Sequence, residues 1–95
     1  MKKYELALVI NGKLDEASKL EALEKAKGYI TRFGGTITDA AEWGKRRLAY
    51  EINHINEGFF YFIKFEANTD APKEIEKRVR IMESVIRYLI VSDEK

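Results

Sequence analysis

GFFYFIKFE, residues 58–66, places five aromatic side chains within nine positions. Successive side chains of a β-strand point to opposite faces, so odd- and even-numbered residues form two separate sets. The even set includes Lys64 and Glu66, and charged side chains are rarely buried. We therefore predict a strand over residues 59–67 with one buried face and one open face. The buried face carries Phe59, Tyr61, Ile63 and Phe65, and the open face carries Phe60 and Phe62.

The same period of two predicts three more strands, over residues 3–11, 36–50 and 84–92. Gly44 interrupts the second of these, which is typical of a bulge or bend. Residues 53–58, NHINEG, predict a turn that joins the second and third strands in a hairpin. In the first and last strands, the residues expected to point into the core are Leu6, Leu8, Ile10, Ile86, Tyr88 and Ile90.

Two helices are predicted between the strands. Asp15 is placed to cap the first helix, and Gly34 with Gly35 to end it. The second helix begins at Thr69 and Asp70, with Pro72 in its first turn, where the missing N–H costs nothing. The apolar stripes expected to be buried are Leu20, Leu23, Ala26, Ile30 and Phe33, then Ile75, Val79 and Met82. The charged residues of the first helix, interpreted as solvated ion pairs, are Glu16, Glu21, Glu24, Lys19, Lys25 and Lys27.

The resulting order is β-α-β-β-α-β in a single domain of 95 residues. With right-handed crossovers, it predicts an α+β fold, the ferredoxin-like sandwich, in which two helices cover one face of a four-stranded antiparallel sheet. The second and fourth strands lie at the sheet edges. The face without helices is expected to show Val9, Phe60, Phe62, Leu89 and Val91, edged by Lys3, Lys64 and Arg87.

An exposed apolar patch of this kind usually marks a contact surface. Two alternatives are cross-strand packing with nothing bound, and a homodimer formed through the patch. The RNA-recognition motif shares this topology, but its third-strand pattern requires Phe59 and Tyr61 on the open face. Because Lys64 and Glu66 indicate the opposite orientation, we reject base stacking by that motif.

The composition excludes several classes of function. The chain has no cysteine and one histidine, His54, so we expect no metal site and no cofactor. The loop NGKLDEAS, residues 11–18, lacks the arginine and the anion cradle of an acylphosphatase-type hydrolase, so we expect neither that activity nor its small-molecule substrate. No apolar run approaches the roughly 20 residues that span a bilayer, and the N-terminus does not resemble a signal peptide. We expect a cytoplasmic protein without a membrane partner.

Residues 42–52, EWGKRRLAYEI, contain three consecutive basic residues directly after Gly44. Lys45, Arg46 and Arg47, with aromatic rings nearby, suit contacts with phosphate groups. Basic residues also protect an edge strand from aggregation, and spacing alone leaves both interpretations open. With 17 basic and 16 acidic residues the net charge is +1, so RNA binding requires a local patch or a more basic companion.

The segment WGKRRLAYEI resembles the signature of the bacterial small-subunit ribosomal protein S-six family. The opening MKKYE, the aromatic strand after a glycine and VIRYLIV near the end lie where that family has their equivalents, so the resemblance covers nearly the whole chain. It implies a non-catalytic ribosomal protein that binds 16S ribosomal RNA in the central domain of the small subunit, together with small-subunit protein S-eighteen. Two departures weaken the expected partner binding. Glu51 stands where the family most often has proline, and the chain stops at Lys95, short of the tail that many members carry.

Two surfaces are therefore expected. By resemblance, residues 2–4 match the family's N-terminal motif, and Trp43 with residues 45–50 match its second-strand motif. The expected RNA-binding residues are Lys2, Lys3, Tyr4, Lys45, Arg46, Arg47 and Arg87. The expected partner-binding residues are Trp43, Tyr50, Phe60, Phe62 and Leu89. The alternative is a ferredoxin-like protein-interaction or homo-oligomeric module without RNA, for which the apolar face and an edge strand would suffice.

Overall fold

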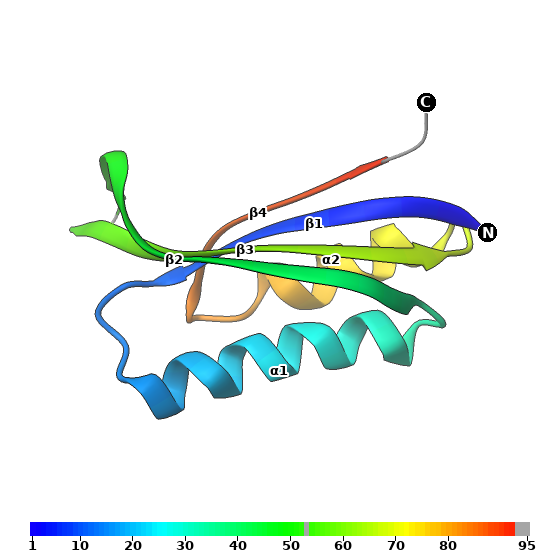
Figure 1. The fold of residues 1–95 in the computed structure, drawn as a ribbon, viewed down its shortest axis with the longest axis horizontal. Helices are drawn as coiled ribbons and strands as arrows, with labels where there is room; N and C mark the ends of the chain where they lie inside the picture. Colours follow the sequence, from blue (N-terminus) through cyan, green and yellow to red (C-terminus); the bar gives the residue numbers. More distant parts are fainter. Residues whose placement is uncertain (53, 93–95) are drawn as a thin grey trace.

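The computed structural model describes residues 1–52 and 54–92. Its elements are β1 (Lys2–Asn11), α1 (Glu16–Arg32), β2 (Thr36–Ile52), β3 (Ile55–Ala67), α2 (Ala71–Arg80) and β4 (Val85–Ser92). The strands form one antiparallel sheet in the order β2-β3-β1-β4. Both helices lie on the same face of the sheet (Figure 1). The predicted ferredoxin-like α+β fold is confirmed, with β2 and β4 at the edges.

The core lies between the sheet and the helices, and the alternation in β3 predicts its side correctly. Tyr61, Ile63 and Phe65 are buried, and Phe59 packs against the core while partly exposed. The neighbouring strand β1 contributes Leu6, Leu8 and Ile10, as predicted. The helices contribute chiefly Ala26, Ile30, Ile75 and Val79.

The first helix is capped as predicted and buries Leu23, Ala26 and Ile30 of the predicted stripe, but not Leu20. The Asp15 carboxylate accepts a hydrogen bond of 2.8 Å from the Ser18 N–H, and Gly34 ends the helix with a φ of 85°. Leu20, expected in the core, is 47% exposed, whereas Lys19 is buried. The helical stripe through Ala22 runs back to position 19, and position 20 lies about 100° further around the helix.

A bulge in β4 changes which of its residues face the core. Val9 pairs with Arg87, but Ile10 pairs with Val85, so β4 holds one extra residue at this point. Val85 packs against the core in place of Ile86, which was predicted to do so. Ile86 and Val9 instead both pack over Gly58 on the open face. A Cβ added to Gly58 would lie 3.5 Å from Ile86 Cδ1 and 2.5 Å from Val9 Cγ1. Val9 is consequently buried, although it was expected to be part of the exposed patch.

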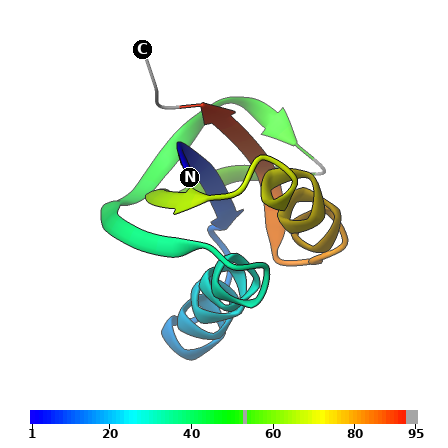
Figure 2. The same ribbon diagram turned by 90° about the vertical axis from the view of Figure 1, so that its right-hand side faces the viewer.

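The hairpin of β2 and β3 is longer than predicted. β2 continues to Ile52 and β3 begins at Ile55, so most of the predicted turn at residues 53–58 is strand. Asn53 lies outside the described residues, and His54 has a φ of 64°. The predicted irregularity at Gly44 is confirmed by a φ of 80° and a register shift after Glu42. The hairpin bends away from the helices and curves over the open face of the sheet (Figures 1 and 2).

Candidate nucleic-acid and partner interface

The end of β2 reaches across the open face and contacts β4. In a flat sheet of four strands these two edges would lie about 14 Å apart, three inter-strand spacings. Here the Arg87 guanidinium donates a 2.7 Å hydrogen bond to the Tyr50 hydroxyl and lies 5.3 Å from the centre of its ring. The curvature of the hairpin brings the two edges together (Figure 2). Arg87, expected to bind RNA, and Tyr50, expected to bind the partner, thus form one contact.

The open face also carries an aromatic pair. The Trp43 ring lies 4.7 Å from the Phe62 ring at an interplanar angle of 53°. Ala41 pairs with Phe62, so alternation along β2 places Trp43 on this face as well. Phe60 and Phe62 are half-buried, whereas Trp43 is 54% and Leu89 60% exposed. Four of the expected partner-binding residues therefore lie on the open face: Trp43, Phe60, Phe62 and Leu89. The fifth, Tyr50, reaches over this face from the end of β2.

The three consecutive basic residues are divided between the two faces of β2. Lys45 pairs with Phe59 and Arg47 with Glu57, positions that share the helix-side face, whereas Arg46 pairs with Gly58 on the open face. The Lys45 ammonium lies 5.5 Å from the Phe59 ring centre. Arg46 Nε donates a 3.3 Å hydrogen bond to the Trp43 carbonyl, and its guanidinium lies 5.2 Å from the Trp43 ring. These residues do not form a single basic patch.

The N-terminal residues lie at the other end of the sheet from the basic segment. Lys2 pairs with Ala67, whereas Lys45 pairs with Phe59 eight residues earlier on the same strand, a separation of about 26 Å. Lys2 and Lys3 are exposed. Tyr4 is 9% exposed and its ring stacks on Phe65 at 5.6 Å. The Tyr4 ring is therefore engaged in core packing, which argues against its expected contact with RNA.

A charged cluster beneath the basic segment was missed by the sequence analysis. Lys19 Nζ lies 3.1 Å from Glu16 Oε2 and 3.5 Å from Glu42 Oε2, and 4.8 Å from the Phe59 ring centre. The Tyr61 hydroxyl donates to Glu42 Oε2 at 3.3 Å. The hydrogen bond to Glu16 raises the pKa of Lys19, although burial opposes this, and burial raises the pKa of the Tyr61 phenol. Completing the buried stripe of α1 backwards from Ala22 would have indicated Lys19.

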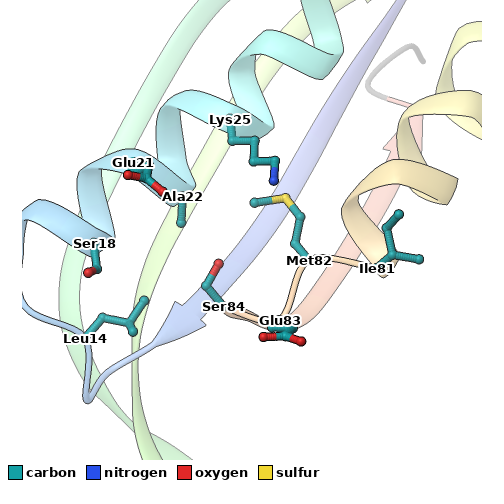
Figure 3. Close-up of a pocket in the computed structure, with 9 residues that line it drawn as sticks. All are labelled: Leu14, Ser18, Glu21, Ala22, Lys25, Ile81, Met82, Glu83 and Ser84. Carbon is teal, nitrogen blue, oxygen red and sulfur yellow. The ribbon is translucent and has the colours of Figure 1, made fainter.

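Two hollows of the described surface lie on opposite sides of the sheet. One, of about 450 Å³, lies between α1 and the segment after α2, with Lys25, Glu21 and Glu83 among its lining residues (Figure 3). Another, of about 420 Å³, lies on the open face and is lined by Ala7, Val9, Arg87, Tyr88 and Leu89. In the part of the chain that the structure describes, no group of acidic, histidine or cysteine side chains is arranged to hold a metal ion. No described helix is both long and apolar enough to cross a membrane.

Comparison with known proteins identifies the family. A model of the ribosomal protein S6 family matches residues 3–92. The chain belongs to the ribosomal protein S6 family. It is 43% identical to small ribosomal subunit protein bS6 of Clostridium novyi over the full length of both chains. The identity to bS6 of Clostridium botulinum is 42%, over 99% of this chain and all of that one.

The fold agrees with this assignment. The crystal structure of 30S ribosomal protein S6 from Thermotoga maritima superposes with a TM-score of 0.90 at 27% identity, covering 96% of this chain and 86% of that one. As a member of the S6 family, the protein is a structural constituent of the small ribosomal subunit and not an enzyme. The family resemblance and the non-catalytic function predicted from the sequence are thereby confirmed.

Proposed function

We propose that the protein binds 16S ribosomal RNA in the central domain of the small subunit, jointly with ribosomal protein S-eighteen, in the cytoplasm. The observation that carries this proposal is the basic segment after the Gly44 bulge, held on a folded edge strand in a member of the S6 family. A net charge of +1 supports joint binding, because this chain alone provides little long-range attraction for a polyanion.

The phosphate contacts are assigned first to the helix-side face of β2. Lys45 and Arg47 project there, both are exposed, and neither is in an ion pair among the described residues. Lys2 and Lys3, about 26 Å away, provide a second point of phosphate contact. Two separated points would fix the orientation of the protein on a folded RNA without reading its sequence.

The open face is assigned to the protein partner. Trp43, Phe60, Phe62 and Leu89 supply apolar area, and Tyr50 supplies a ring with a polar end, the composition of the centre of many protein interfaces. Arg46 and Arg87 lie on this side, each over an aromatic ring, so we transfer them from the phosphate-contacting set to the border of the partner surface. Arginine is enriched at such interfaces.

The test is a filter-binding titration of 16S ribosomal RNA with this protein alone and with S-eighteen, across a series of salt concentrations. We expect tight binding only when both proteins are present, and an affinity that falls steeply with salt. A folded protein that binds neither the RNA nor S-eighteen would refute the proposal.

A partner surface without RNA contact is the second candidate. The exposed Leu89 and Val91 on the open face favour it. The double variant Phe60→Ala with Phe62→Ala separates the two surfaces. We expect it to weaken S-eighteen binding and leave the salt dependence of RNA binding unchanged. Unchanged partner affinity in a folded variant would show that these rings serve packing alone.

A further inference from the structure

Lys19 is a charged side chain in a buried position. Lys19 is 7% exposed, and within the described ranges 1–52 and 54–92 it is the one charged residue that is buried. Burying an ammonium group is costly unless it is paired and hydrogen-bonded. The carboxylates of Glu16 and Glu42 and the ring of Phe59 surround the ammonium group, so Lys19 keeps its charge. Through Glu42 and Phe59 it contacts β2 and β3.

The partner of Lys19 on the sheet stands at the point where β2 bends. Glu42 is the last residue in regular pairing with β3 before the register shift, and Gly44 follows with its φ of 80°. Lys19 and Tyr61 both contact the same oxygen, Glu42 Oε2. Glu42 is thereby fixed from α1 and from β3 directly before the bulge that reverses the alternation of the following residues.

The residue after the bulge is linked to the same site. The ammonium groups of Lys19 and Lys45 both lie over the Phe59 ring, at 4.8 and 5.5 Å from its centre. Two cations near one ring repel each other, and the Glu16 and Glu42 carboxylates offset the charge of Lys19. The position of Lys45 therefore depends on the balance of charge around Lys19.

We propose that Lys19 is a positioning residue for the RNA- and partner-binding segment. Through Glu42 and Phe59 it holds the bend of β2 directly after Trp43, and that bend sends Lys45 to the helix-side face and Arg46 to the open face. This role rests on the proposed function, since it concerns the orientation of the residues assigned to RNA and partner. Lys19 lies on α1 and is only 7% exposed, so in this role it acts through Glu42 and Phe59 rather than by direct contact with either ligand.

The experiment compares Lys19→Met, which keeps the length of the side chain and removes its charge, with Lys19→Arg and Glu42→Gln. Lys77→Met is the matched control, because Lys77 forms a similar 3.5 Å pair with Glu74 on α2, away from the bend. The first measurement is residue-resolved amide hydrogen exchange. We expect exchange at residues 42–47 to accelerate about tenfold in Lys19→Met, with a smaller change at residues 36–38 and near wild-type rates in Lys19→Arg.

The second measurement is binding of 16S ribosomal RNA in the presence of S-eighteen. We expect affinity to fall more than about threefold in Lys19→Met and Glu42→Gln, and to be preserved in Lys77→Met and largely in Lys19→Arg. Unaltered exchange at residues 42–47 would overturn the positioning role, as would altered exchange with unaltered binding. If the wild-type protein binds no RNA, the proposed function fails, while the exchange data still decide whether Lys19 holds the bend.

Discussion

Replacing Lys45 and Arg47 with alanine should reduce the salt dependence of RNA binding, whereas replacing Arg46 should not. The reason is the pairing of β2 with β3, which places Lys45 and Arg47 on one face of the strand and Arg46 on the other. An RNA surface that contacts Lys45 and Arg47 from one side of β2 cannot also reach Arg46 on the other side. Arg46 is further engaged by the carbonyl and the ring of Trp43.

The size of the effect follows from counterion release. Each phosphate contact contributes about 0.7 to 0.9 to the slope of log affinity against log salt concentration, so losing two contacts lowers the slope by about 1.4 to 1.8. Over a fourfold rise in salt, the ratio of wild-type to variant affinity should therefore change by about 7- to 12-fold. Arg46→Ala should change the slope by less than about half a unit and should weaken S-eighteen binding instead.

The assay is filter binding with S-eighteen present, at four or more salt concentrations, with wild-type and variant proteins. A double variant of two exposed helix residues, Lys73→Ala with Arg80→Ala, removes the same charge elsewhere and should retain the wild-type slope. Equal slopes for the Lys45/Arg47 variant and the wild type would refute the assignment of phosphate contacts to this face. A slope change of a full unit for Arg46→Ala would refute the division of the segment between two faces.

Three further predictions concern stability and the open face. Gly58→Ala would place a Cβ 2.5 Å from Val9 Cγ1 and 3.2 Å from the Ile10 carbonyl oxygen. This crowding should lower the free energy of unfolding by about 1–3 kcal/mol. An unchanged midpoint of urea unfolding would contradict this packing. Phe62→Ala should shift the fluorescence of Trp43, the single tryptophan, to longer wavelength, and unaltered emission would argue against their contact. The hydrogen bond from the Ser18 N–H lowers the pKa of Asp15 in the folded protein. The ionised Asp15 carboxylate therefore stabilises the fold above the ordinary aspartate pKa of about 3.9, and this stabilisation is lost as the pH falls through the lower pKa of the folded state. Asp15→Asn should make the melting temperature less sensitive to pH below about 4, and parallel curves for variant and wild type would exclude this role.

Local sequence patterns were sufficient to predict the helices and strands and most of the core residues. The alternation around Phe59 and Lys64 assigned the faces of β3 correctly because side-chain direction in a strand has a fixed period of two. The same rule failed in β4, where one extra residue opposite Val9 reverses the alternation at Ile86. A bulge of this kind carries no glycine or proline signal in VIRYLIV, and only the pairing with β1 reveals it.

The residues assigned to the candidate site stay predictions, and their arrangement did not follow from the sequence. The resemblance of WGKRRLAYEI to the S6 family predicted the family correctly, and the bulge at Gly44 was predicted from its glycine. The division of Lys45 and Arg46 between two faces depends on the register after that bulge. The core position of Tyr4 could have been found from its alternation with Leu6 and Leu8.

The sequence by itself determined the order of the elements, the side of the sheet that the helices cover, and the family, because periodicity, capping residues and motifs are local properties of the chain. Only the tertiary structure decided that Tyr50 meets Arg87 across the sheet and that Lys19 is buried against Glu42. Those contacts join residues 37 and 23 positions apart, and they depend on the twist of the sheet and the docking of α1. Twist, register and docking arise from the packing of all elements together, and no single segment specifies them.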